Sequence, residues 1–192
     1  MRDFLPDIAA APDPEKSALT ARHREAVFRA LNEWEAAENE LSGRDPDAYF
    51  MGAALALAKL AASEGEVPVG CVIARDGKIL AADCNGRETF KNALRHAECA
   101  AIGEACGTLG GWRLPGCTLY VTLEPCPMCA GAIWNARIPL AVIGAKDARA
   151  GAMGSLLNLA SYPLNPKPEV VFGVREKECL SVLQAFFAGR RK

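Results

Sequence analysis

One histidine, one glutamate and two cysteines are spaced in this chain as the ligands and the proton carrier of a metal site. His96 and Glu98 form an H-x-E motif, Cys126 and Cys129 lie in a P-C-x-x-C motif, and 26 residues separate Glu98 from Pro125. An imidazole and two thiolates give a zinc ion three protein ligands, one fewer than a closed structural site has. A catalytic zinc keeps its fourth position for water, so the pattern predicts a catalytic zinc site with Glu98 beside the metal.

Helix ends are expected to hold these ligands. Cys126 and Cys129 stand three residues apart at the start of a predicted helix, which puts both sulfurs on one face, a turn apart. The free N–H groups and the positive field of a helix N-terminus favour the thiolate that binds zinc. His96 also falls at a predicted helix start, so two facing helix ends would hold one ion. His23 is the other of the two histidines, and it is predicted to be a surface residue.

The expected chemistry is hydrolysis of an amine on a heterocyclic ring. A zinc ion lowers the pKa of its bound water to about 7, which makes hydroxide available at neutral pH. Glu98 would take the proton of that water, pass it to a ring nitrogen and help the exocyclic amine to leave as ammonia. In this combination the two motifs resemble those of zinc-dependent nucleobase deaminases. The alternatives are a solvated Glu98 on a helix face and a structural zinc knuckle, whose fourth ligand no second close motif supplies.

The composition fits a single domain with a substantial core, since 51% of the 192 residues are apolar. No stretch of 18 apolar residues is free of charges or helix breakers, and the start lacks the long apolar segment of a signal peptide. We therefore expect no membrane span and a cytoplasmic protein. Two of the eight cysteines belong to the metal motif, and the other six are predicted to be buried free thiols in a reducing compartment.

The formal net charge of −1 conceals an asymmetry along the chain. Residues 1–47 carry 6 basic and 11 acidic side chains, whereas the remainder carries 16 basic and 12 acidic ones. A moderately basic second part suits a polyanionic substrate, but it is equally consistent with a domain that has a basic end.

Two regions are predicted. Residues 1–45 form an acidic leader over 1–16 and an amphipathic helical arm over 17–41, whose apolar face is expected to pack on its own domain or on a second subunit. Residues 46–192 form a zinc-dependent deaminase domain, since Asp45 can cap and Pro46 can begin the next helix. The apolar residues at helical spacing in the arm are Val27, Ala30, Leu31, Trp34, Ala37 and Leu41.

Helices and strands alternate in the second region, which predicts an α/β fold of three layers, α/β/α, around a five-stranded mixed sheet. Asp76-Gly77 is a strong hairpin signal between the first two strands. Strands are predicted over 69–74, 78–82, 118–122, 141–143 and 170–174, and helices over 47–63, 96–106, from about 125 to before 138, and 175–188.

Longer motifs resemble one family in particular, the bacterial tRNA-specific adenosine deaminases of the cytidine/deoxycytidylate deaminase superfamily. The resemblance covers about residues 47–190 and rests on Glu66-Val67-Pro68-Val69-Gly70, Gly111-Trp112-Arg113-Leu114, and the runs 122–132 and 144–156. It implies a cytidine-deaminase-like fold, one Zn²⁺ per subunit, and a homodimer whose groove for the tRNA anticodon stem-loop uses both subunits. It also implies conversion of the wobble adenosine of an arginine tRNA to inosine.

The resemblance further implies roles for residues around the zinc. Asn85 matches the asparagine that holds the target nucleoside, and Val69 and Leu123 would line the base pocket. Asp147 matches the acid that touches the nucleotide backbone, and Lys146 would lie at the groove. From the residues alone, Asn85 also fits a turn and Asp147 a loop cap. The last helix would flank the anticodon loop with Phe186, Phe187, Arg190 and Arg191, although a pair of phenylalanines is more often core.

Departures from the family pattern lie near the pocket and the groove. Ala93-Leu94-Arg95 stand before the histidine in place of Pro-Thr-Ala, Pro166 stands where an Asn-His pair is usual, and Leu140 replaces an arginine. These changes bear on the loop over the pocket and on contacts with tRNA, not on the zinc.

Other substrates and another class of protein stay open. The Cys126 motif and Trp134 suit a guanine deaminase, or a deaminase of another free purine or nucleoside, almost as well, whereas the 147–155 segment and the basic tail favour tRNA. A cytidine deaminase would resemble a three-cysteine site, but this chain has His96. The third hypothesis is a catalytically silent RNA-binding or scaffold protein. The complete set of His96, Glu98, Cys126 and Cys129 argues against it.

Overall fold

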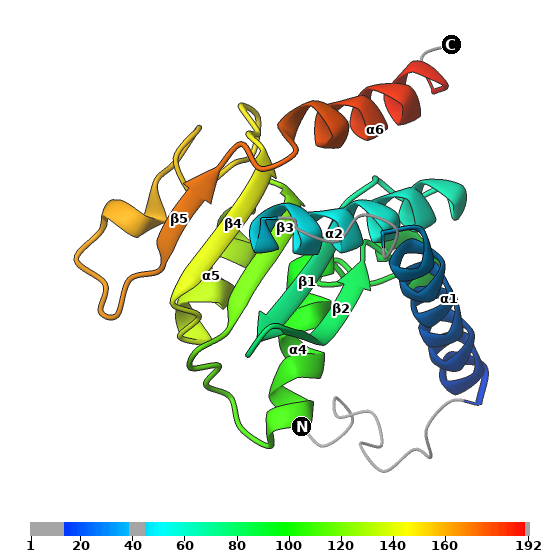
Figure 1. Ribbon diagram of the computed structural model, residues 1–192, viewed down its shortest axis with the longest axis horizontal. Coiled ribbons are helices and arrows are strands. Elements are labelled where there is room, and N and C mark those ends of the chain that lie inside the picture. Colours follow the sequence, from blue (N-terminus) through cyan, green and yellow to red (C-terminus); the bar gives the residue numbers. More distant parts are fainter. Residues whose placement is uncertain (1–13, 39–44, 191–192) are drawn as a thin grey trace, which may run out of the picture.

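Five strands form one mixed sheet in the order β2-β1-β3-β4-β5, and helices cover both of its faces (Figure 1). The computed structural model describes residues 14–38 and 45–190, so the predicted leader before residue 14, Leu41 of the arm and Arg191 of the tail lie outside the described residues. In these described ranges, none of the helices combines the length and the apolar character that a membrane crossing needs. The elements in chain order are α1 (Pro14–Glu38), α2 (Pro46–Ser63), β1 (Gly70–Arg75), β2 (Lys78–Cys84), α3 (Arg87–Phe90), α4 (Ala97–Leu109), β3 (Thr118–Leu123), α5 (Pro127–Asn135), β4 (Leu140–Ala145), η1 (Leu159–Ser161), β5 (Glu169–Phe172) and α6 (Glu176–Ala188).

The sheet combines both strand directions, as the sequence predicts. β1 pairs antiparallel with β2 and with β3, whereas β3, β4 and β5 pair in parallel. Asp76 and Gly77 join β1 to β2 with φ values of 53° and 73°, the left-handed pair that a two-residue hairpin turn requires. α2 and α6 cover one face of the sheet, and α4 and α5 cover the other. The predicted three-layer α/β/α architecture is therefore confirmed.

Alternation along the central strands divides the core into two halves. In β1, Cys71 and Ile73 belong to the cluster under α4 and α5, whereas Val72 and Ala74 belong to the cluster under α2. This division arises because successive side chains of a strand point to opposite faces of the sheet. Both clusters are buried, so the strands are held from two sides and their ends provide a fixed support for the loops that follow them.

The helical arm packs on its own domain. α1 begins at Pro14, earlier than predicted, and lies against α2 beside the β2 edge of the sheet (Figure 1). Val27 is buried against this domain, and the ring of Trp34 lies 4.7 Å from that of Tyr49 in α2. The prediction that His23 is a surface residue is wrong, since its side chain lies one turn before Val27 and the residue is only 4% exposed. Its imidazole is accommodated there because it meets a carboxylate of β2.

The segment that follows β4 folds around a buried carboxylate, Glu124. Its oxygens accept hydrogen bonds from the backbone N–H groups of Asp147 (3.0 Å), Met153 (3.0 Å) and Ser155 (2.9 Å), and from the Ser155 hydroxyl. Gly151 lies against the same carboxyl group, where an added Cβ would stand 2.4 Å from Glu124 Cδ. One side chain just beyond β3 therefore fixes the course of residues 147–155.

Replacing this carboxylate by an amide should loosen the segment. In Glu124→Gln one oxygen becomes an NH₂ group that faces N–H and O–H donors, so we expect stability to fall by about 1.5–3 kcal/mol, the range for hydrogen bonds to a charged group. Urea unfolding measures the difference. Glu169→Gln changes an exposed glutamate at the start of β5 and serves as the control, with an expected change within about 0.5 kcal/mol.

The pH dependence of the stability of the native protein and of Glu124→Gln tests whether the ionised form of Glu124 stabilises the fold. Burial alone would raise the pKa of Glu124, but the hydrogen bonds from Ser155, Asp147 and Met153 outweigh it and lower that pKa below its ordinary value of 4.5. A carboxyl group with a lower pKa in the folded state stabilises the fold above its ordinary pKa and loses this effect as the pH falls. The stability difference between the native protein and Glu124→Gln should be full above pH 4.5 and shrink below it. A difference that stayed constant at lower pH would contradict a role for the ionised form.

Candidate active site

One edge of the sheet gathers the predicted substrate residues. Because β1 runs antiparallel to β2 and β3, while β4 runs parallel to β3, the start of β1 and the ends of β2, β3 and β4 meet at this edge. Gly70 pairs with Cys84, and Leu123 pairs with Ala145, which aligns these ends. The predicted residues in or next to them are Val69, Asn85, Leu123, Lys146 and Asp147.

The three zinc-ligand candidates lie at two helix N-termini. His96 directly precedes α4 and Cys126 directly precedes α5, both with extended backbone. Pro127 begins α5, where its missing N–H removes no helical hydrogen bond. Cys129 is buried in the first turn of α5. Two helix starts therefore meet at the candidate site, and their side chains come within reach of one ion.

The three candidate ligand atoms have the spacing that zinc requires. His96 Nδ1 lies 3.7 Å from Cys126 Sγ and 3.5 Å from Cys129 Sγ, and all three atoms lie within 4.8 Å of one another. A tetrahedral zinc ion, with bonds of about 2.0–2.1 Å to nitrogen and about 2.3 Å to sulfur, separates its ligand atoms by roughly 3.5–3.8 Å. One imidazole and two sulfurs in this arrangement fit a zinc ion and leave one position for a non-protein ligand.

Hydrogen bonds within the group favour a thiolate. The hydrogen bond from Cys129 lowers the pKa of Cys126 to about 3, against the effect of burial and with help from His96. The pKa of Cys129 is raised, first because its thiol is hydrogen-bonded to Cys126 and then because of its hydrogen bond with Cys99. The form of cysteine that binds a metal is therefore favoured at Cys126 before any metal arrives.

A third sulfur lies beside this group. Cys99 Sγ is 3.8 Å from Cys129 Sγ, but among the described residues it is not part of the group within 4.8 Å. Cys99 and Cys106 are half-buried, so the prediction of buried thiols is wrong for these two, which α4 presents at its less covered side. All eight cysteines are free, and the prediction is confirmed for Cys71, Cys84, Cys117 and Cys179.

The carboxyl group of Glu98 is almost completely shielded from solvent. It lies in the first turn of α4, two residues after His96, and is buried. Burial is the main reason why the pKa of Glu98 is raised above its ordinary value. A carboxyl group with a raised pKa exchanges protons more readily near neutral pH, which suits general acid and base chemistry. Glu98 is therefore not a solvated acid on a helix face.

A cavity of about 140 Å³ opens between these elements. Because one water molecule occupies only about 30 Å³ of the liquid, this cavity can take a larger ligand. Lys146 does not line it, since its ammonium group lies over the ring of Phe172, 5.2 Å from the centroid. The lining residues are His96, Glu98 and Cys126, the predicted Val69, Asn85, Leu123 and Asp147, and in addition Val67, Arg87, Ala97, Glu124 and Ala150.

Two buried acids that support the cavity are absent from the predicted site. Glu66 accepts hydrogen bonds from Asn85 Nδ2 (3.1 Å) and from the backbone N–H of Thr89 (2.7 Å). Glu124 holds the segment that carries Asp147, whose Oδ1 in turn accepts N–H groups of its own loop at 2.8 and 3.2 Å. Asp147 is thus a loop cap as well as a lining residue. Both acids stand next to apolar residues at a strand or helix end, which is the sequence signal that could have found them.

The last helix presents aromatic side chains to solvent. Phe187 is 45% exposed, and its ring lies 5.3 Å from that of Phe186. The guanidinium of Arg190 lies over the Phe186 ring, 4.2 Å from the centroid, and donates to the carbonyl of Gly65. The interpretation of this pair as core is therefore wrong for Phe187, which lies on the outer side of α6.

Comparison with known proteins identifies the family. Residues 44–145 match the family model described as the cytidine and deoxycytidylate deaminase zinc-binding region. The tRNA-specific adenosine deaminase of Bacillus subtilis is 49% identical over 147 residues, which cover 76% of this chain and 91% of that protein.

Solved structures agree with this assignment. One from a study of A-to-I editing by tRNA:A34 deaminases at the wobble position of transfer RNA has a TM-score of 0.69 and 43% identity, and covers 70% of this chain and 99% of that chain. The guanine deaminase of Nitrosomonas europaea has a TM-score of 0.60 at 21% identity over 73% of this chain and 84% of its own, which shows a common fold alone. This chain therefore belongs to the deaminase family defined by the cytidine and deoxycytidylate deaminase zinc-binding region, and within it to the group that contains the tRNA-specific adenosine deaminases.

Proposed function

We propose that this protein is a zinc-dependent hydrolase that deaminates the wobble adenosine of a tRNA anticodon to inosine. The observation that carries the proposal is the meeting of a buried Glu98 with the candidate ligands His96, Cys126 and Cys129 at the cavity. The 49% identity to the Bacillus subtilis protein supports tRNA as the substrate. By the resemblance of its motifs, we propose an arginine tRNA in particular.

In this proposal His96, Cys126 and Cys129 hold one Zn²⁺ per subunit. The metal, when bound, supplies activation of a water molecule at neutral pH. Glu98 accepts a proton from the attacking water, delivers it to the ring nitrogen and then assists the departure of the amine as ammonia. The raised pKa of Glu98, caused mainly by burial, supports this role, because a carboxyl group that holds a proton more readily than usual can act as acid as well as base.

Asn85 is proposed to hold the target nucleoside. Its Nδ2 donates a hydrogen bond to Glu66, so its Oδ1 is the acceptor that can accept a hydrogen bond from an N–H or O–H group of a ligand. Val69 and Leu123 would contact the base, since both line the cavity. Asp147 would reach the nucleotide backbone through its second carboxylate oxygen, while the first holds its own loop.

The RNA beyond the target base is proposed to lie outside the cavity. A space of about 140 Å³ suits a single base, so the target would leave the stack, as is common for enzymes that act on nucleobases. Lys146 is exposed and does not line the cavity, so its ammonium group can meet a phosphate outside it. Phe187 offers an exposed ring on which a neighbouring unpaired base can stack.

The domain boundary, the assembly and the location complete the proposal. We place the boundary at residue 46, because the matched region begins at residue 44 and α1 precedes it. A homodimer is supported by the family resemblance of the sequence motifs. Eight free cysteines support a reducing cytoplasm.

The substrate is tested by offering the purified protein an unmodified arginine tRNA with adenosine at the wobble position, beside free guanine and free adenosine. We expect A-to-I conversion confined to the wobble base, read by sequencing of the RNA, and ammonia release from the tRNA alone. Ammonia from guanine with untouched tRNA would assign the protein to purine salvage instead. Zinc-loaded protein that released no ammonia from any of them would be a silent RNA-binding protein.

Salt dependence is the control for this experiment. Contacts with phosphates release counterions, so the affinity for a labelled anticodon stem-loop should fall about 10-fold or more between about 50 and about 200 mM salt. Fluorescence anisotropy measures it. A flat response would argue for a small neutral substrate.

Removal of the Glu98 carboxyl should separate chemistry from metal binding. Glu98→Ala is expected to keep its zinc and to lose about 10²–10⁴-fold in kcat, the range for general acid and base catalysis. Metal analysis and single-turnover deamination measure the two effects. Glu104→Ala changes a glutamate of the same helix that does not line the cavity, and it should retain activity. Full turnover by Glu98→Ala would remove this residue from the mechanism.

Removal of one sulfur should instead release the metal. Cys126→Ala is expected to lose zinc, activity and stability together, because metal binding is coupled to folding. Zinc content and the thermal midpoint are the measurements. Cys106→Ser alters a half-buried cysteine that bonds to the carbonyl of Trp112, and it should keep its zinc. An unchanged zinc content in Cys126→Ala would point to a different set of ligands.

A further inference from the structure

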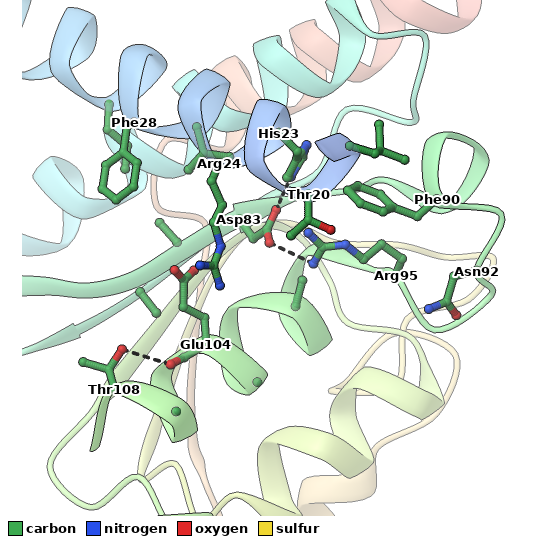
Figure 2. Close-up of a pocket in the computed structure, with 18 of the residues that line it drawn as sticks. Thr20, His23, Arg24, Phe28, Asp83, Phe90, Asn92, Arg95, Glu104 and Thr108 are labelled. Atoms are coloured by element: carbon green, nitrogen blue, oxygen red, sulfur yellow. Dashed lines mark hydrogen bonds and ion pairs between the residues drawn. The ribbon is translucent and has the colours of Figure 1, made fainter. Parts of the chain in front are cut away.

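A second, larger cleft of about 1010 Å³ separates α1 from β2 and α4 (Figure 2). At one end of it, His23 of α1 and Arg95 of the loop before α4 both point at Asp83 of β2. Phe90, from α3, lies beside them. We call these four residues the Asp83 cluster. His23 and Arg95 therefore meet at the Asp83 carboxylate, and Phe90 lies against both of them.

Both oxygens of Asp83 are engaged. His23 Nε2 lies 2.7 Å from Oδ1, and Arg95 Nη1 lies 2.8 Å from Oδ2. Oδ1 also accepts the backbone N–H of Cys84 at 2.7 Å. His23 is 4% and Asp83 6% exposed, so water cannot readily replace a partner that is lost.

Phe90 connects the two partners of the carboxylate. Its ring centroid lies 5.1 Å from that of His23, with the planes nearly perpendicular at 88°, and 4.6 Å from Arg95 Cζ. Gly86 makes this position accessible, since a Cβ there would stand 2.9 Å from Phe90 Cδ2. The polar and aromatic contacts therefore form one packed unit rather than separate pairs.

The Asp83 cluster lies at the two ends of the loop from Asn85 to His96. The N–H of Gly86 donates to the carbonyl of Arg95 at 3.1 Å, so the backbone already ties these ends together. Asp83 stands two residues before Asn85, and Arg95 directly before His96. The Asp83–Arg95 ion pair therefore holds the residue proposed to grip the nucleoside and a proposed zinc ligand in a fixed relation.

We propose that α1 is a positioning element of the deaminase site and that His23 is the positioning residue through which it acts. α1 precedes the matched region 44–145, so this contact reaches the family core from outside it. His23 holds Asp83 in the orientation that binds Arg95, and the ion pair then sets the start of α4. Its kinetic test rests on the proposed function, whereas its structural tests do not.

A metal ion at the same place fits less well. Ligand atoms of His23, Asp83 and Cys84 lie within 4.8 Å of one another, the second such group among the described residues. Burial, and then the charge of Asp83, raise the pKa of the Cys84 thiol, which keeps it protonated. Both carboxylate oxygens already accept other groups, and a cation would also face Arg95. The cluster is therefore a structural link.

Three variants of the full chain separate positioning from simple packing. His23→Leu keeps the volume but removes the N–H donor, and His23→Gln keeps a donor at a similar reach. Val27→Ala removes buried packing from the same face of α1 and leaves the Asp83 cluster intact, so it is the matched control for loss of stability.

Amide hydrogen exchange of the zinc-loaded proteins is the first measurement. In His23→Leu, residues 86–95 should exchange roughly ten-fold faster than in the native protein, because local opening of that loop becomes easier. In His23→Leu, the rate at which zinc is transferred to a chromogenic chelator should also be higher than in the native protein. His23→Gln should restore most of the protection, and Val27→Ala should leave exchange in this loop unchanged.

Deamination of the wobble adenosine is the second measurement. His23→Leu should lower kcat about 10-fold with KM changed less than about 3-fold, since displaced ligands and catalytic groups cost rate more than binding. Val27→Ala should stay within about 2-fold of native kcat at an equal loss of thermal midpoint. If His23→Leu leaves loop exchange, zinc release and kcat at native values, or Val27→Ala changes all three as much, the proposal is wrong. If the native protein does not deaminate tRNA at all, the proposed function fails while exchange and zinc release still decide this inference.

Discussion

The candidate site depends on one constraint, which is that an imidazole and a sulfur 30 residues apart must lie within 3.7 Å of each other. The path of the chain meets this constraint. α4 runs away from the sheet edge at which His96 stands, β3 returns to that edge, and α5 leaves it again after Cys126. Both helices cover the same face of the sheet, so their N-termini meet where the strand between them ends. The positive ends of two helices and the carboxyl edge of the sheet thus coincide, which is where open α/β sheets commonly bind ligands.

Buried acids fix the segments around this meeting point, and they divide into two kinds. Glu66, Asp83 and Glu124 each accept hydrogen bonds from the chain, and through them they hold Asn85, the start of α4 and the loop that carries Asp147. Glu98 differs, since the effect of its burial outweighs that of its hydrogen bonds, and its pKa is raised. Glu66, Asp83 and Glu124 therefore stabilise the fold, whereas Glu98 can exchange a proton. The distinction follows from how many N–H donors each acid meets.

The zinc candidates and the order of helices and strands could be predicted from the sequence because their signals are local. The H-x-E and P-C-x-x-C spacings, the Asp76-Gly77 turn and the alternation in β1 each lie within a few neighbouring residues. α3 is too short to show a periodic pattern, and the position of the Lys146 ammonium group depends on the ring of Phe172, a residue of another strand. His23 could not be placed, because its burial arises from Asp83, 60 residues further along. What the sequence does not reveal is therefore mainly the long-range pairing of polar groups.

The position of α1 has a consequence for how such enzymes diverge. Of the described residues, none in α1 lines the smaller cavity. α1 reaches the site through His23, which contacts Asp83 and Phe90, so substitutions in this helix can change how firmly an inherited site is held without changing the chemistry performed there. Selection on the arm can therefore adjust turnover in small steps while the pocket stays constant. Two relatives with identical pockets can then differ in rate because of a helix that neither substrate nor metal contacts.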